Sequence, residues 1–351
     1  MNRQYSERMF RNPNYCVFKR LIATLYCVCW AVMVPAQDRV SYRIRSTSKP
    51  VTQIGAVLDY TGQELVFRPH NESTRRIPAD LVAGIQTHYD PAYLSGLEAF
   101  RAGDTQLART SLATALKNEN REWVDRDIHA WLVKCALRED DLRQALFHFR
   151  EIIRSDAETR HWGVAPLVWA PMNIGNDVKT QARQWLIGAS RSDQLLAVSL
   201  LLDDVDMADT ATRKLDDLAR DTNPRISSLA RAQQWRLKLA QGNISDVTLT
   251  SWARTVGRML ESLRGGPQYL VARGYRQRGE HRRASSEYLW IPYVYDQRPD
   301  LAARSMLEAA ESMERTGLTG EANLLYRELV AQYTWASEAR IASSKLSDNP
   351  N

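Results

Sequence analysis

The chain has 351 residues, of which 44% are apolar and 25% are charged, with 16 glycines and 13 prolines. This composition is that of ordinary globular proteins, so it excludes a wholly disordered chain, a collagen-like repeat and a protein with many membrane spans. The length predicts roughly one to three domains, with ample chain to bury a core.

The positive charge is concentrated at the N-terminus. The formal net charge is +6, but residues 1–36 contain five of the 47 basic residues and only one of the 41 acidic residues. The remainder, with 42 basic and 40 acidic residues, is close to neutral. Nucleic-acid binding generally needs a strongly basic surface. We therefore expect no nucleic acid among the partners.

Residues 1–36 have the three parts of a secretory signal peptide. Lys19 and Arg20 precede an apolar run of 14 residues, 21–34, and Pro35-Ala36 follows it. Such a run spans about 21 Å as a helix, which is shorter than the roughly 30 Å hydrocarbon core of a bilayer. We expect cleavage after Ala36 and a periplasmic or secreted bacterial protein. The alternative is an uncleaved leader that anchors the chain and is then its only contact with a membrane.

Residues 37–90 are the strand-like part of the chain. Short runs at 40–45, 54–60, 64–68, 75–78 and 82–87 are separated by the turn Thr61-Gly62 and by polar loops. Runs bounded by Gly, Pro and Asn predict strands and hairpins. Four or five strands in about 50 residues suggest a small meander or a partly closed barrel that hides strand edges. The pattern from Gly55 to Ile85 resembles small SH3-like or Sm-like barrels, which implies a barrel-like module. Whether this module binds a ligand or caps the helices that follow stays open at this stage.

Helical periodicity begins at Pro91, and one spacing then recurs four times. Each copy has a small residue early in a first helix, a Gly or Asp in a turn, an Ala in the second helix and a large residue four positions later. Antiparallel helices approach closely only where both carry small side chains. The four copies are Gly96, Ala99, Gly103, Ala108, Leu112 and Ala115; Val133, Ala136, Asp140, Ala145, Phe149 and Ile152; Ala272, Tyr275, Gly279, Ala284, Tyr288 and Ile291; Ala310, Met313, Gly317, Ala322, Tyr326 and Leu329.

This spacing resembles the tetratricopeptide repeat (TPR). The resemblance covers 91–157 and 265–351 and implies a mainly α chain, in which an α-α superhelix follows the small all-β domain at 37–90. The stretch 329–339 is similar to the closing motif of TPR proteins in bacterial envelopes, with Thr334 where proline is usual. Residues 158–264 fit the repeat poorly, and their helical runs at 192–202, 208–220 and 224–240 look more like HEAT-type pairs or irregular hairpins.

In TPR proteins the ligand usually lies on the concave face, which the first helix of each pair lines. The resemblance therefore implies a basic and aromatic groove that suits a protein or peptide, including an acidic one. The alternative is an ordinary solvated face, since every exposed helix carries charges. The fourth copy mixes signs there, with Glu311, Glu314 and Arg315. The groove residues expected from the first three copies are Tyr93, Phe100, Arg101, Lys134, Arg138, Tyr269, Arg273 and Arg276.

The sequence contains no motif for nucleotide binding, metal-dependent proteolysis or a serine nucleophile. The six histidines are scattered, and Cys135 is the one thiol outside the leader, so we expect no cofactor, no metal and no catalytic residue. The acidic stretch 203–209 lacks the glycine and the terminal glutamate of an EF-hand loop. Trp162 and Trp169 lie among prolines, and they predict either an exposed binding patch or a buried cap.

These observations favour an exported helical-repeat scaffold for protein–protein interaction, and not an enzyme. Three alternatives stay open. One is an assembly or secretion factor for envelope proteins, and another is an enzyme with its active site inside the helical array. The third is a purely structural component that self-associates.

Overall fold

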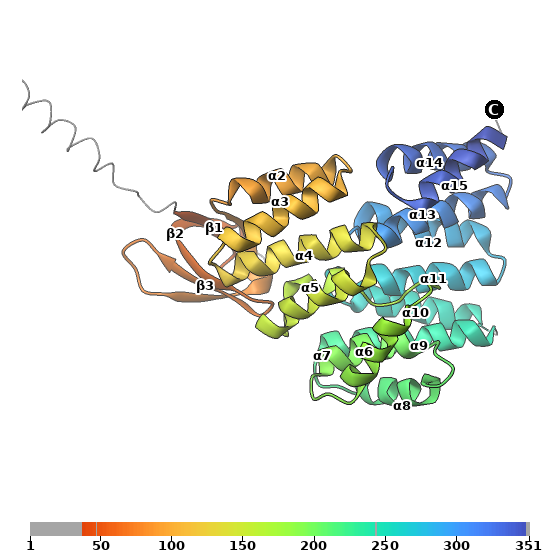
Figure 1. The fold of residues 1–351 in the computed structure, drawn as a ribbon, viewed down its shortest axis with the longest axis horizontal. Helices are drawn as coiled ribbons and strands as arrows, with labels where there is room; N and C mark the ends of the chain where they lie inside the picture. The colour runs from red at the N-terminus through yellow and green to blue at the C-terminus, as the bar shows by residue number, and fades with distance from the viewer. Residues whose placement is uncertain (1–36, 47, 243, 349–351) are drawn as a thin grey trace, which may run out of the picture.

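The computed structural model describes residues 37–46, 48–242 and 244–348, so the predicted signal peptide lies outside the described residues. The protein is mainly helical, with one antiparallel sheet at its N-terminal end and consecutive helices packed against each other (Figure 1). This arrangement is compatible with a helical repeat. No helix in the described part of the chain has the length and hydrophobicity needed to cross a bilayer.

The sheet is open, so the expectation of a barrel is wrong. Its five antiparallel strands have the order β4-β3-β2-β1-β5, and β4 and β5 do not pair with each other. A closed barrel needs that last pairing, but β4 has only four residues and instead the inner face of the sheet is covered by helices. The strands are β1 (Asp38–Tyr42), β2 (Val51–Tyr60), β3 (Glu64–Pro69), β4 (Arg75–Pro78) and β5 (Val82–Gln86).

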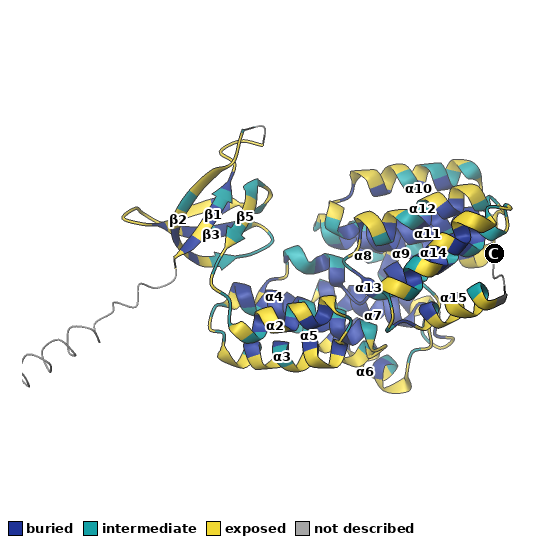
Figure 2. Cartoon of the chain, turned by 90° about the horizontal axis from the view of Figure 1, so that it is seen from above, coloured by how far each residue is buried: buried dark blue, intermediate teal, exposed yellow. Residues whose placement is uncertain are grey.

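Alternation along the strands explains which face of the sheet is buried. Val40, Leu65 and Phe67 are fully buried, and they share one core cluster with Leu112 and Trp123 from the first helices. Successive side chains of a strand point to opposite faces, so the other face of the sheet is left to solvent (Figure 2). The sheet therefore caps the beginning of the helical array.

The helices begin where the sequence offers capping side chains. Asp90 accepts a hydrogen bond from the Ala92 amide, and Pro91 follows it at the first helical position. The predicted start at Asn223-Pro224 is confirmed, with Asn223 accepting from the Arg225 amide. The helices are α2 (Pro91–Arg101), α3 (Thr105–Asn118), α4 (Glu122–Arg138), α5 (Leu142–Ser155), α6 (Asn176–Leu186), α7 (Arg191–Leu201), α8 (Ala208–Leu218), α9 (Pro224–Gln241), α10 (Asp246–Arg258), α11 (Gly265–Gln277), α12 (His281–Val294), α13 (Pro299–Glu314), α14 (Thr319–Gln332) and α15 (Ser337–Asp348), with short 3-10 turns at Ala79–Leu81, Arg160–Val164 and Glu261–Leu263.

Four helix pairs, α2–α3, α4–α5, α11–α12 and α13–α14, share one turn geometry. The turn positions of the repeated spacing all have a positive φ: 85° at Gly103, 54° at Asp140, 79° at Gly279 and 81° at Gly317. This left-handed conformation favours glycine, and aspartate is one of the few other residues that adopt it. The alanines at the helix crossings, such as Ala108 and Ala284, have no exposed surface.

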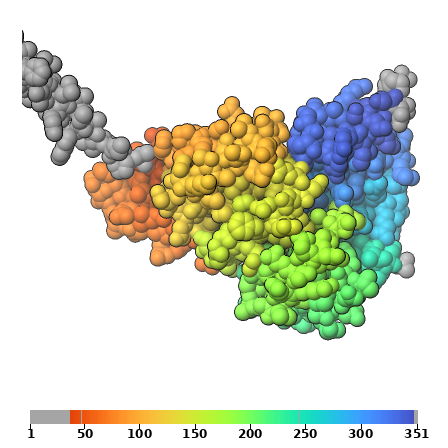
Figure 3. Space-filling view, viewed as in Figure 1, coloured from red at the N-terminus to blue at the C-terminus, as the bar shows by residue number. Residues whose placement is uncertain are grey.

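The array curves until its two ends meet. Helix α13 contacts α4, and the turn after α2 approaches the loop after α14 at Gly103 and Thr334. Figure 3 shows the helix pair α2–α3, in orange, in contact with the C-terminal helices, in blue, on one face. The helices therefore form a closed arc around their buried centre, which Figure 2 shows as the dark band through the array.

Candidate functional site

A stretch without helix or strand, residues 165–171, runs through the interior of the helical array. Its backbone is satisfied by side chains from several helices. The Val168 amide donates to Ser199 Oγ at 2.8 Å, and Gln233 Nε2 donates to the Val168 carbonyl at 3.0 Å. Arg298 Nη1 donates to the carbonyls of Ala165 and Leu167 at 2.8 and 3.1 Å. We call these residues the inner segment.

The inner segment is held by close packing as well as by hydrogen bonds. Trp169 lies against Gly266 in α11, where a Cβ atom would sit 2.0 Å from the indole ring. Trp162 and Trp169 are both buried, so this part of the chain is the buried cap and not the exposed patch. The array thus already binds one stretch of its own chain that is neither helix nor strand.

Beyond the inner segment lies a cavity of about 500 Å³, which we call the basic cavity. It opens between α11, α12 and α13, and Pro171 at the end of the inner segment forms part of its wall. Three of the expected groove residues, Tyr269, Arg273 and Arg276, line it together. The complete lining is Pro171, Leu239, Tyr269, Arg273, Arg276, Gln277, His281, Tyr288, Glu308 and Arg315.

Positive charge exceeds negative charge in the basic cavity. Arg276 is paired with Glu311 at 2.6 Å and with Glu308 at 3.4 Å, and Glu308 also accepts a hydrogen bond from Tyr269 Oη at 2.8 Å. Arg273 and Arg315 have no carboxylate partner among the described residues. The cavity therefore lacks counter-charge for two guanidinium groups.

His281 adds a titratable donor to the same wall. Its Nδ1 is buried and has no hydrogen-bond partner among the described residues. Partial burial lowers the pKa of His281, and the charges of Arg315 and Arg276 lower it further. A bound anion would oppose the effect of both arginines and would offer an acceptor for the ring.

The other five expected groove residues lie elsewhere. Tyr93 and Phe100 are buried in the core cluster that the first helices share with the sheet. Arg101 is exposed, and the Lys134 ammonium lies 4.2 Å from the centre of the Trp131 ring. Arg138 lines a separate cavity of about 200 Å³ on the other side of the inner segment, together with Arg298 and Arg304.

His281, Glu308 and Pro171 are among the lining residues of the basic cavity that were not expected as site residues. His281 and Glu308 fall outside the positions that the repeat frame assigns to the concave face, although their positions on α12 and α13 bring them to its rim. Pro171 belongs to a loop whose path no local pattern indicates. Its prolines and tryptophans were the one available signal.

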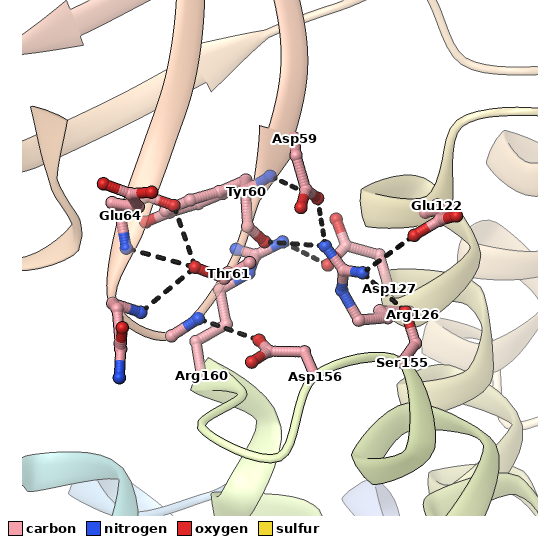
Figure 4. A network of polar contacts seen from close by, with 12 residues as sticks. Asp59, Tyr60, Thr61, Glu64, Glu122, Arg126, Asp127, Ser155, Asp156 and Arg160 are labelled. Carbon is pink, nitrogen blue, oxygen red and sulfur yellow. Dashed lines mark hydrogen bonds and ion pairs between the residues drawn. The ribbon is translucent and has the colours of Figure 1, made fainter. Parts of the chain in front are cut away.

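A second polar cluster fixes the sheet to the helices (Figure 4). Arg126 of α4 is buried; it pairs with Asp59 at the end of β2 and donates to Ser155 Oγ at 2.7 Å. Asp156 accepts from the Gly62 amide at 2.8 Å, so the β2–β3 turn is bound on two sides. In the same cluster, Arg160 pairs with Asp127 of α4. Both arginines are paired with carboxylates and Asp156 accepts from backbone amides, so this cluster is a structural joint.

Other candidate chemistry is sparse in the described part of the chain. No group of three His, Cys, Asp or Glu side chains there is arranged to hold a metal ion. Cys135 is buried, and burial raises the pKa of its thiol to about 12, so it stays protonated at neutral pH. No protein-family model, curated protein or solved structure matches this chain.

Proposed function

We propose that the chain is an exported TPR-like scaffold that binds an acidic segment of a protein or peptide in the basic cavity. The helix pairs, their common turn and the buried alanines at their crossings support the TPR-like part of the proposal. The leader sequence supports export.

The observation that carries the proposal is the pair of uncompensated guanidinium groups, Arg273 and Arg315, in one cavity. A guanidinium presents a planar fork of donors that matches a carboxylate, and such charge-assisted bonds are about twice as strong as neutral ones. Glu308 and Glu311 already hold Arg276 in place. An incoming carboxylate would therefore be bound by Arg273 and Arg315, with His281 beside them.

The inner segment shows how the array can bind a backbone that is neither helix nor strand. Gln233 and Arg298 donate to backbone carbonyls of the inner segment, so these contacts do not depend on its side chains. Gln277 has the same kind of amide in the basic cavity, and it donates to the Leu239 carbonyl at 3.1 Å. A partner segment in the basic cavity would meet the second N–H of the Gln277 amide for its backbone and cations for its acidic side chains.

Fluorescence anisotropy with labelled peptides tests the proposal. The probe is an octapeptide that alternates Glu with Ser, and its counterparts carry Gln or Lys in place of Glu. We expect the protein to bind the Glu peptide, to bind the Gln peptide at least tenfold more weakly and to ignore the Lys peptide. The double variant Arg273→Glu/Arg315→Glu should lose the Glu peptide.

The matched control is Arg327→Glu/Arg340→Glu, which changes the net charge equally at two exposed arginines of α14 and α15 that have no ion-pair partner among the described residues. The proposal fails if this control loses the Glu peptide as strongly as the cavity variant does. It also fails if the wild-type protein binds none of the three peptides.

A further inference from the structure

The outer face of the sheet combines cations with exposed aliphatic side chains. In the ladder Arg39 is opposite Ile54, and Ala56 is opposite Arg68, so these four residues share one face. Ile54 and Leu58 have relative exposures of 45% and 43%. Leu58 follows at a register irregularity between Val57 and Asp59, and its exposure places it at the solvent side of the sheet beside these residues.

The hairpin between β1 and β2 continues this composition at its tip. Ile44 has a relative exposure of 69%, and Arg43, Arg45 and Lys49 beside it are exposed. Ser48 Oγ accepts from the amides of Ile44 and Arg45 at 3.1 Å. Figure 2 shows that the connection from β1 to β2 extends away from the helices. We call this surface the basic–aliphatic face: Arg39, Arg43, Ile44, Arg45, Lys49, Ile54, Leu58 and Arg68.

No negative charge balances this face. Between residues 39 and 58 the sequence contains no Asp or Glu. Asp38 is buried, where it accepts from the Val57 amide at 2.7 Å, and Asp59 is paired with Arg126. None of the five cations of the face forms an ion pair with another described residue. Arg75 and Arg76 on β4, in contrast, pair with Glu72 and Glu64.

We propose that the basic–aliphatic face docks on the surface of an anionic lipid bilayer. Surfaces that bind such membranes carry Lys and Arg for the headgroups and aliphatic side chains for the boundary with the acyl chains. The exposed large side chains here are Ile and Leu, whereas a single-stranded nucleic acid would be bound on aromatic platforms.

The order of the chain supports the same partner. The apolar run 21–34 ends three residues before β1 begins at Asp38. Any membrane contact of that run during or after export would therefore keep β1 and its hairpin near the lipid surface. The basic cavity is formed by α11 to α13, so membrane docking through the sheet does not use the residues proposed to bind the acidic segment.

Vesicle co-sedimentation tests the proposal with the chain that begins at Gln37, which keeps every strand and helix described above. The vesicles are phosphatidylcholine with and without phosphatidylglycerol. We expect binding only to the anionic vesicles. Arg43→Glu/Arg45→Glu should weaken it at least about tenfold, since each basic residue near such a surface contributes about fivefold. Ile44→Ser should weaken it about threefold and should leave the circular dichroism spectrum unchanged.

The charge-matched control is again Arg327→Glu/Arg340→Glu, which should bind like the wild type. The proposal is wrong if the hairpin variant sediments with anionic vesicles as well as this control does. It is equally wrong if the wild type binds neither kind of vesicle. Binding of single-stranded RNA through Arg43 and Arg45 in that case would identify the other class of partner. The full-length chain should show the same preference for anionic vesicles, diminished by the same double substitution.

Discussion

The guanidinium of Arg138, at the end of α4, lies 5.0 Å from the centre of the Trp335 ring, which follows α14. The same guanidinium lies 3.3 Å from the Phe100 ring and donates to the Phe100 carbonyl at 2.6 Å. Arg138 therefore joins the first two helix pairs to the last one. Burial lowers its pKa to about 10, so it keeps its charge at neutral pH.

We predict that Arg138→Ala loosens the closed array. The substitution removes two cation–π contacts and one donor to the Phe100 carbonyl, which still accepts from the Gly103 amide. We expect a loss of about 2 kcal/mol of unfolding free energy. Urea denaturation measures this loss, and small-angle scattering should show a larger radius of gyration. Arg101→Ala, at an exposed site on α2, is the control. A variant as stable and compact as that control would show that the ends are held together by other contacts.

Gly266 offers a test of the inner segment. A Cβ atom there would lie 2.0 Å from the Trp169 ring, so Gly266→Ala must displace a buried tryptophan. We expect a loss of about 3 kcal/mol in unfolding free energy, measured by urea denaturation. The double variant Gly266→Ala/Trp169→Leu should be more stable than the sum of the two single changes predicts, because the smaller side chain removes the clash.

Gly257→Ala is the matched control for that change. Gly257 lies within α10, and no atom lies within 4 Å of its ideal Cβ. Alanine there should leave stability unchanged or raise it by about 0.5 kcal/mol. If Gly266→Ala behaves in the same way, Trp169 does not occupy the position that the structure assigns to it.

A histidine pair gives the fold a dependence on pH. His129 Nδ1 and His148 Nδ1 are 3.0 Å apart between α4 and α5. Burial lowers the pKa of each to about 4, and for His129 the neighbouring His148 and Arg154 add to the effect. The unfolded chain binds protons at these histidines below about pH 6.5, whereas the folded chain does so only near pH 4. Stability should therefore fall as the pH drops from 7 towards 4.

We expect the pair to remove up to about 2 kcal/mol per histidine between pH 7 and pH 5. The measurement is the unfolding free energy in urea at both pH values. His129→Gln/His148→Gln should be less sensitive to acid than the wild type, while His70→Gln, at an exposed site, should not differ from it. An equal loss of unfolding free energy between pH 7 and pH 5 in all three proteins would show that the His129–His148 pair does not cause the acid sensitivity.

The local part of the architecture could be predicted from the sequence. The small residues at 96, 108, 136 and 145 lie where the helices of a pair cross closely. The turn positions at 103, 279 and 317 are glycines because the backbone there has a positive φ. Such signals lie within one helix pair. They depend on neighbours that are close in the chain, which is why periodicity reveals them.

The long-range part could not be predicted. Whether β4 pairs with β5 depends on which helices cover the sheet, and the path of the inner segment depends on Ser199, Gln233 and Arg298, which are distant in the chain. The same reason explains why only Tyr269, Arg273 and Arg276 of the expected groove residues line the basic cavity. The frame places Arg273 and Arg276 on one helix, α11, and the structure shows that they share a cavity. The frame does not show that Phe100 packs into the core of the first helices or that Arg138 contacts Trp335.

The proposed peptide site should itself depend on pH through His281. In the free protein, burial and the charges of Arg315 and Arg276 lower the pKa of this ring. A carboxylate bound beside these arginines cancels part of their repulsion and raises that pKa, so binding takes up a proton. The affinity for the Glu peptide should therefore increase as the pH falls through the range in which His281 titrates. Anisotropy titrations at pH 7.5 and pH 5.5 measure the change, and the wild type should bind more tightly at the lower value.

His281→Asn keeps a polar side chain at this position without a titratable group, so it should bind with nearly the same affinity at both values. A wild-type affinity that does not change, or an Asn variant with the full change, would show that His281 does not contact the bound carboxylate.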